Sequence, residues 1–270
     1  MRLVSRLNDI VLAILAKDKA YCLDLYLKCL LNQTFPKSRI RLWVRTNDNK
    51  DETKEILDKF IRDHGYKYKS IYYDYSNIDS SLKGYEEHEW NSTRFGLLGR
   101  IRQESIEYTK EHNAHYVVVD CDNFLAPHVL QSMYDDRHLG LIGPMLRLAE
   151  DRGYANFHHK SCPLGYMDTD DPIYWQILKK EITGKIKVAT LHCTYLIRNS
   201  LLDYARYVDE TEDWEYIVFS NSLKKYNIPQ YMDNSTFQGL LYLNTADCGR
   251  SYDQWFEEIW TEAVKQLMQV

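Results

Sequence analysis

The first half of the chain alternates apolar runs of strand length with amphipathic segments of helical period. Runs typical of buried strands occupy residues 9–16, 40–46, 68–75 and 115–122. Apolar side chains recur every three or four residues over 21–33, 51–65 and 92–113, which predicts three helices. Strands separated by helices predict an α/β fold, with a mostly parallel sheet covered by helices on both faces.

The second half has a less regular pattern. Residues 140–148 predict another strand, residues 151–171 a polar loop, and residues 186–199 one long apolar strand that contains His192. Amphipathic spacing predicts a helix over 212–227 and a terminal helix over 253–268. Since no repeat, linker or low-complexity segment divides the chain, we predict a single domain over residues 1–270.

Composition narrows the class of protein. The net charge of −5 gives no basic field for nucleic acid, and the longest apolar run near the start is too short to span a membrane. We see no signal peptide, which favours the cytosol. Six cysteines without CxxC pairs argue against a zinc ribbon and a dense disulfide framework, and Cys22 and Cys29 are expected to be buried thiols.

Two carboxylates follow the apolar run that ends at Val119. Asp120 and Asp122 stand where a parallel sheet binds ligands, outside the carboxyl end of a strand. Oxygen ligands at this spacing suit Mg²⁺ or Mn²⁺, and a metal held by two carboxylates keeps positions open for substrate phosphates. Asp168 and Asp170 have the same spacing but no apolar strand before them, so we expect a solvated turn there.

Two reaction classes fit a strand that ends in such a pair. In phosphatases of the haloacid dehalogenase type, the first Asp is a nucleophile, but the pair lies near the start of the fold. Here it comes after 119 residues, and Phe124 stands where those enzymes usually have Thr or Val. Glycosyl transfer from a nucleotide sugar, in which a metal clamps the diphosphate leaving group, fits better.

The ordered motifs carry a family resemblance that extends from about residue 10 to 245. The segments "HYVVVDCDNFL", "GLIGPMLRL", "YANFHH", "VATLHCTYLIRN", "EDWEYIVFSNSLKKYNI" and "NSTFQGLL" occur in this order. Together they resemble glycosyltransferase family 25, the procollagen galactosyltransferases, and the related glycosyltransferase-like domains of collagen lysyl hydroxylases. The resemblance implies a GT-A (Rossmann-like) fold, with a nucleotide-sugar half at 8–123, an acceptor half at 124–250 and a C-terminal helix at 251–270.

The resemblance also implies Mn²⁺, with Mg²⁺ as an alternative, and a UDP-hexose donor. The metal ligands would be Asp120, Asp122 and His192, because Thr236 stands where the family often has a late histidine. Asn156 would line the sugar site, where His158 replaces a Trp usual in the family. Residues at the end of the first strand and on the helix before the motif strand are also expected to contact the donor. The full set expected to bind it is Ala16, Lys17, Asp18, Arg102, Gln103, Asp120, Cys121, Asp122 and Asn156.

The segment "TEDWEY" offers the carboxylates for a catalytic base. The family's β-galactosyl product implies inversion, which needs a base to take the acceptor's proton. Asp213 is our first candidate and Glu215 the second, although an Asp before a helix is also a common cap.

We therefore expect a transferase that moves a hexose, galactose by preference, to hydroxylysine of a collagen-like chain. Glucosyl transfer to galactosyl-hydroxylysine is the nearest rival, and a non-catalytic accessory module is the rival from another class. The resemblance favours the endoplasmic reticulum over the cytosol. The compartment therefore stays open, as does a possible homodimer.

Overall fold

The computed structural model describes residues 8–78, 91–148, 153–211 and 213–242. The helix predicted at 253–268 lies outside these residues. In the described part of the chain, no helix is both long enough and apolar enough to cross a membrane.

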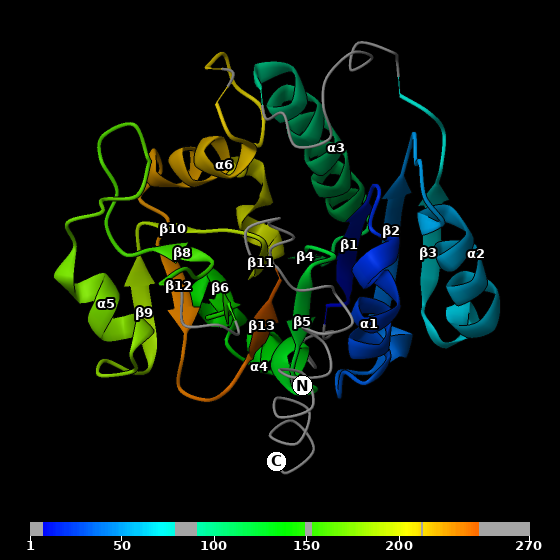
Figure 1. The fold of residues 1–270 in the computed structure, drawn as a ribbon, viewed down its shortest axis with the longest axis horizontal. Coiled ribbons are helices and arrows are strands. Elements are labelled where there is room, and N and C mark those ends of the chain that lie inside the picture. Colours follow the sequence, from blue (N-terminus) through cyan, green and yellow to red (C-terminus); the bar gives the residue numbers. More distant parts are fainter. Residues whose placement is uncertain (1–7, 79–90, 149–152, 212, 243–270) are drawn as a thin grey trace, which may run out of the picture.

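The strand–helix alternation predicted for the first half is confirmed (Figure 1). The strands are β1 (Ile10–Ala16), β2 (Ile40–Thr46), β3 (Ser70–Asp74) and β4 (His115–Val119). The helices are α1 (Ala20–Leu31), α2 (Thr53–His64) and α3 (Ser92–Glu111). Each boundary lies within a few residues of the one predicted.

One large mixed sheet organises the described residues. Its strand order is β3-β2-β1-β4-β11-β6-β12-β9, with β6 at Leu141–Pro144, β9 at Lys185–Val188, β11 at Thr194–Ile197 and β12 at Gln230–Asp233. The pairs among β3, β2, β1 and β4 are parallel, whereas β11 is antiparallel to both of its neighbours. The expectation of a mixed, mostly parallel sheet is confirmed.

Two small sheets, three further α-helices and short 3-10 helices are also among the described elements. One sheet pairs β8 (Phe157–His158) with β10 (Thr190–Leu191), and the other orders β5 (Asn123–Leu125), β13 (Gly239–Leu241) and β7 (Arg147–Leu148). The helices are α4 (Val129–Asp135), α5 (Pro172–Leu178) and α6 (Glu215–Lys224). Of these, the sequence predicted only α6.

The prediction of one long strand over 186–199 is wrong. The segment forms β9, β10 and β11, which belong to two different sheets. The segment cannot continue as one strand because the chain turns between β10 and β11, where Cys193 has a left-handed φ of 66°. The strand predicted at 140–148 is likewise divided, into β6 of the large sheet and β7 of a small one.

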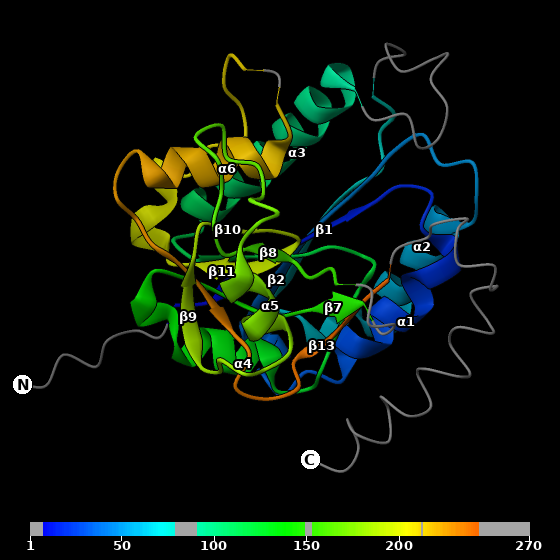
Figure 2. The ribbon, with the colours of Figure 1, turned by 60° about the vertical axis from the view of Figure 1, so that its left-hand side comes forward.

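The central strands of the large sheet are buried on both faces, whereas the outermost strands, β3 and β9, are partly exposed. Ile10, Leu12 and Ile14 of β1 pack in the cluster formed with α1, α2 and α4, whereas Val11 and Ala13 pack in the cluster formed with α3 and α6. Figure 2 shows α3 and α6 on the opposite side of the sheet from α1 and α2. Successive side chains of β1 thus alternate between two apolar clusters, as expected for a strand between two layers of helices.

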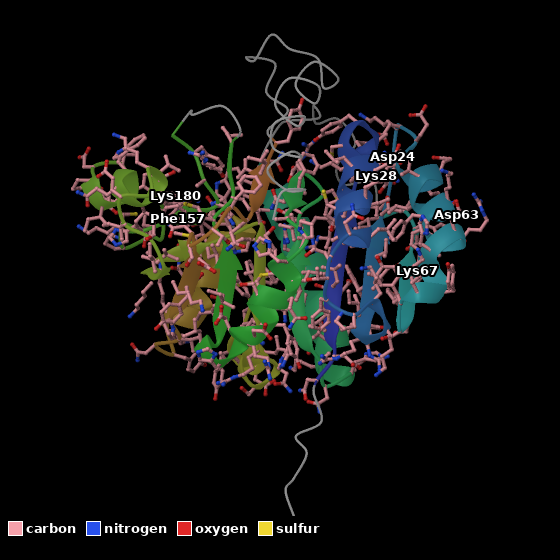
Figure 3. All side chains as sticks on the ribbon, turned by 90° about the horizontal axis from the view of Figure 1, so that it is seen from below. Asp24, Lys28, Asp63, Lys67, Phe157 and Lys180 are labelled. Atoms are coloured by element: carbon pink, nitrogen blue, oxygen red, sulfur yellow. The ribbon has the colours of Figure 1, made fainter. Side chains whose placement is uncertain are left out.

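Polar and charged side chains cover the outer helix surfaces. Asp24 and Lys28 of α1 and Asp63 of α2 are exposed in this way (Figure 3). The expected burial of Cys22 and Cys29, on the inner face of α1, is confirmed.

The parallel strands bring three loops to one edge of the sheet. The Asp18 N–H donates to Asn49 Oδ1 at 3.1 Å, and the Lys19 N–H donates to Thr53 Oγ1 at 2.7 Å, which ties the loop after β1 to the loop after β2. The turn after β4 reaches the same edge, where Asp122 meets Lys19. The candidate site lies at this edge.

Candidate active site

A tight turn after β4 sets the directions of Asp120 and Asp122. The Asp120 carbonyl accepts a hydrogen bond from the Asn123 N–H at 2.9 Å, and the Asp120 N–H donates to Cys193 O at 3.0 Å. The Asn123 amide also donates to Thr194 Oγ1 at 2.8 Å. Because β11 holds the turn from one side, both carboxylates are fixed at the edge of the sheet.

Arg102 of α3 joins Asp120 to Glu215, the first residue of α6. Its Nη2 donates to Asp120 Oδ1 at 2.8 Å, and its Nε lies 3.5 Å from Glu215 Oε1. The Arg102 and Glu215 side chains are only 7% and 8% exposed. The guanidinium is thus a fixed cation between two carboxylates that are 95 positions apart in the chain.

Burial dominates the protonation of both carboxyl groups. Desolvation raises the pKa of Asp120; the guanidinium of Arg102 opposes this shift and the neighbouring Asp122 adds to it. Desolvation likewise raises the pKa of Glu215, again opposed by Arg102. A carboxylate with a raised pKa beside a ligand-binding edge has the character of a proton acceptor.

Asp122 pairs with Lys19, a residue that the sequence analysis did not single out. Lys19 Nζ lies 3.0 Å from Asp122 Oδ2 and also donates to Tyr21 Oη at 3.1 Å. Burial alone would lower the pKa of Lys19, but Asp122 and Tyr21 raise it well above its ordinary value. In the sequence, its position is the feature that could have pointed to a role at the site: Lys19 stands directly before α1, at the same strand end as Lys17 and Asp18.

The other residues expected after β1 and β4 have structural contacts. Asp18 has a φ of 52° and accepts a hydrogen bond from the Lys50 N–H at 2.6 Å. Cys121 is buried and its thiol donates to Leu15 O at 3.2 Å. Ala16 is buried at the end of β1, Asp18 is partly exposed and Lys17 is exposed at the edge.

The side-chain amides of two predicted donor-binding residues form hydrogen bonds to other groups of the protein. Gln103 donates to Glu107 Oε1 at 2.9 Å and accepts from the Tyr207 N–H at 3.0 Å. Asn156 is fully buried; it accepts from the Leu146 N–H at 2.7 Å and donates to Pro144 O at 3.0 Å and His192 O at 3.3 Å. The expectation that Asn156 lines a sugar site does not fit this burial, because its side chain joins two backbone segments, one at Pro144 and Leu146 and the other at His192.

His192 lies in a group of rings and is not brought into a set of metal ligands with the carboxylate pair. Its ring centroid is 5.5 Å from that of His158 and 5.0 Å from that of Tyr216. Burial lowers the pKa of His192 to about 3 and that of His158 to about 4. His192 Nδ1 contacts Cys193 Sγ at 2.8 Å, and its buried Nε2 has no hydrogen-bond partner.

The two candidate bases have different surroundings. Asp213 is partly exposed and accepts from Tyr166 Oη at 2.5 Å and from the Trp214 N–H at 2.8 Å. It does not cap α6 in the usual way, because the residue at the N-cap is Trp214. Only Glu215 reaches the Arg102–Asp120 pair.

Thr236 lies away from the carboxylate pair. It precedes β13, which runs antiparallel to β5 with Gly239 opposite Leu125 and Leu241 opposite Asn123. The Tyr242 N–H, just after the last residue of β13, donates to Asp122 O at 2.8 Å. Thr236 lies before the other end of this strand. Position 236 is therefore at the far end of β13 from the carboxylate pair.

The carboxylate pair fits a hard divalent cation. Among the side chains that the structure describes, no three from His, Cys, Asp or Glu form a metal-binding group. Mg²⁺ and Mn²⁺ do not need three, since one or two carboxylates, water and substrate phosphates complete their shells. The Asp120 and Asp122 side chains are each 25% exposed, so solvent and ions reach them.

The expected turn at Asp168 and Asp170 is present. Both residues are exposed, and Asp168 Oδ1 accepts a hydrogen bond from the Asp170 N–H at 3.1 Å. This hydrogen bond between the carboxylate and a backbone N–H two residues later stabilises the turn, which explains an Asp at position 168 without a bound ligand.

Comparison with known proteins identifies the family. Residues 7–257 match the family described as Glycosyltransferase family 25, N-terminal domain. The chain belongs to glycosyltransferase family 25. This confirms the resemblance found in the ordered motifs.

The relatives in this family include proteins named as enzymes and proteins named as inactive. Human procollagen galactosyltransferase 2 is 28% identical over 244 residues, covering 86% of this chain and 38% of the relative. Mouse inactive glycosyltransferase 25 family member 3 is 27% identical over 205 residues, covering 74% and 34%. The chain thus spans well under half the length of these relatives.

Solved structures share the fold. S. aureus TarS 1–349 in complex with UDP-GlcNAc has a TM-score of 0.56 at 16% identity, covering 91% of this chain and 60% of that one. Mannosyltransferase PcManGT from Pyrobaculum calidifontis, in complex with GDP-Man and Mn²⁺, has a TM-score of 0.52 at 8% identity, covering 97% and 65%. The expected GT-A fold is confirmed.

Proposed function

We propose that this family 25 member is a metal-dependent hexosyltransferase with a UDP-hexose as donor. The observation that carries the proposal is the charged group of Lys19, Asp122, Asp120, Arg102 and Glu215 at the carboxyl ends of β1 and β4. This edge is where sheets of this topology bind nucleotides. The UDP-GlcNAc and GDP-Man complexes of proteins with this fold give it support.

Asp120 and Asp122 would hold Mn²⁺, or Mg²⁺ in its place. When bound, the metal supplies a Lewis acid for the diphosphate leaving group. Arg102 orients Asp120, since its guanidinium donates to Oδ1, and it opposes the rise in the pKa of Asp120 that burial causes. The exposed Lys17 adds positive charge at the same edge.

Glu215, rather than Asp213, is the base in this proposal. The acceptor hydroxyl gives its proton to the Glu215 carboxylate, its oxygen bonds to C1 of the hexose, and the bond from C1 to the diphosphate oxygen breaks. Glu215 has a pKa raised by burial and lies beside the carboxylate pair, whereas Asp213 is bound to Tyr166. Attack from the face opposite the diphosphate inverts the anomeric centre.

The transferred sugar is galactose and the acceptor is hydroxylysine of a collagen-like protein in this proposal. The support is the name of the human relative, procollagen galactosyltransferase 2, which matches over 86% of this chain. Such an acceptor would place the protein in the endoplasmic reticulum, where collagen chains are made.

A non-catalytic accessory module is the second candidate. It is favoured by the mouse relative named inactive, whose identity of 27% is close to the 28% of the human transferase. The two candidates differ in whether the protein turns over a donor.

The two Asp-x-Asp pairs of the chain provide a matched test of the metal site. Asp122→Asn should lower metal-dependent UDP release by about 10²-fold or more, because it removes one of two charged ligands. Asp168→Asn should leave the rate unchanged, since Asp168 belongs to an exposed turn. Equal rates for the two variants would contradict the assignment of Asp120 and Asp122.

A further inference from the structure

The Lys19–Asp122 ion pair occupies the carboxylate that a metal would need. Lys19 Nζ forms an ion pair with Asp122 Oδ2 at 3.0 Å and lies 5.5 Å from the centre of the Tyr21 ring. A divalent cation that binds Asp122 meets this ammonium, and two cations close to one carboxylate repel each other.

Metal binding would reverse the sign of the net charge of this group of side chains. Three carboxylates, Asp120, Asp122 and Glu215, face two cations, Arg102 and Lys19, so the metal-free group carries one net negative charge. A divalent metal would turn this into one net positive charge if both cations stayed. A diphosphate would then bring in the negative charge that balances it.

The two cations differ in how firmly they are held. Arg102 is 7% exposed and lies between two carboxylates. Lys19 is 28% exposed, and its ammonium is a compact charge at the end of a flexible four-carbon stem. Arg102 is therefore the permanent cation of the site, whereas Lys19 can leave Asp122.

The backbone of Lys19 stays fixed while its ammonium moves. Its N–H donates to Thr53 Oγ1 at 2.7 Å, and its carbonyl accepts from the N–H groups of Cys22 and Leu23, each at 3.0 Å, in the first turn of α1. Neither contact involves the side chain, so release of Asp122 leaves α1 and the loop in place.

We propose that Lys19 is an exchangeable cation: it holds Asp122 while no metal is bound, and it turns to the donor diphosphate when the metal takes Asp122. The first half of this inference needs only metal binding. The second half rests on the proposed function, because it assumes a nucleotide diphosphate at this edge.

Binding of Mn²⁺ alone tests the first half, and free Mn²⁺ can be followed by its electron paramagnetic resonance signal. Lys19→Met should bind Mn²⁺ about tenfold or more tightly than the unmodified chain, because the competing charge is gone. Lys19→Arg keeps that charge, and Lys28→Met removes an equal charge from the exposed side of α1 (Figure 3). Lys28→Met should bind Mn²⁺ as the unmodified chain does, and Lys19→Arg should bind it no more tightly than the unmodified chain.

UDP affinity at saturating Mn²⁺ tests the second half. Lys19→Met should weaken UDP binding by about tenfold while it tightens Mn²⁺ binding, and a residue that merely stabilised the fold would not shift the two affinities in opposite directions. Unchanged or weaker Mn²⁺ binding in Lys19→Met, or an equal gain in Lys28→Met, overturns the exchange.

The outcomes separate this inference from the proposed function. If Mn²⁺ binding tightens in Lys19→Met but no variant binds UDP, competition at Asp122 is supported while diphosphate binding and the proposed donor are contradicted. If donor turnover depends on Mn²⁺ and Lys19→Met leaves Mn²⁺ affinity unchanged, the exchange is contradicted and the proposed function stands.

Discussion

At the scale of single residues, Arg102 links two carboxylates from distant elements. Removing one partner of such a buried group leaves an uncompensated charge, which is costly, whereas the pair itself adds little stability. The group is therefore better explained by what it positions: Asp120 at the end of β4 and Glu215 at the start of α6.

The assignment of Glu215 as base predicts both a loss of rate and a change in pH dependence. Glu215→Gln should lower the turnover number by about 10²- to 10⁴-fold. In the unmodified chain, the rate should rise with pH through a pKa above the ordinary value of about 4.3, since burial raises it. Asp213→Asn should retain most of the rate; the opposite order of the two variants would restore Asp213 as the base.

His192 makes a separate contribution to stability. Its pKa is about 3 in the fold against an ordinary value of 6.5, so the unfolded chain takes up the proton first as the pH falls. The stability that the neutral ring provides is complete above about pH 6.5 and is lost below it, by about 2 kcal/mol at about pH 5.

Denaturant unfolding at about pH 7.5 and about pH 5 measures this loss. His192→Gln should show a smaller decrease between the two conditions than the unmodified chain, whatever its absolute stability, because Gln does not titrate. An equal decrease in both proteins would show that His192 is not buried as a neutral ring.

From the sequence alone, candidate residues could be selected by local pattern and chemistry, but not by the partners that the fold gives them. Asp120 and Asp122 stand out because a buried strand ends directly before them. Lys19 could not be assigned, since its partner Asp122 is 103 positions away. Gln103 and Asn156 have suitable chemistry, but their amides are taken by Tyr207 and by backbone groups that only the fold brings near.

At the scale of elements, β13 fastens the turn that carries the carboxylates. It pairs antiparallel with β5, directly after Asp122, and Gly239 at its start has a φ of 137°. A Cβ at Gly239 would lie 2.2 Å from Phe124 O, so no other residue fits without moving β5.

Two glycines with similar backbone angles test this packing. Gly239→Ala should lower stability by at least about 2 kcal/mol more than Gly184→Ala. Both residues have a left-handed φ, but a Cβ at Gly184 meets nothing within 4 Å. The difference in melting temperature therefore measures the close approach alone, and similar losses in the two variants would contradict it.

Elements with a regular period were predictable, whereas those set by long-range pairing were not. The βα units of the first half repeat a clear pattern, and their ends lie where the sequence places them. The apolar run at 186–199 has no break in its pattern, yet the left-handed Cys193 divides it between sheets. The short strands β5, β13 and β7 are defined by their pairing with one another, and the segments that pair are far apart in the sequence.

At the scale of the whole molecule, the fold brings the charged group to one edge from both halves of the chain. Residues 19, 102, 120 and 122 come from the first half and Glu215 from the second, so the site forms only when the complete sheet is built. Ligands that bind only the folded state should raise the free energy of unfolding by about 2.7 kcal/mol when their concentration is about 100 times the dissociation constant.

The most direct measurement of the central claim is UDP release by the purified chain across a panel of UDP-hexoses, with and without a hydroxylysine-bearing collagen peptide. The account predicts turnover of one hexose well above the others, stimulated by the peptide, supported by Mn²⁺ and abolished by EDTA. Folded protein that releases no UDP from any donor, with Mn²⁺ and peptide present, would contradict it and favour a non-catalytic module.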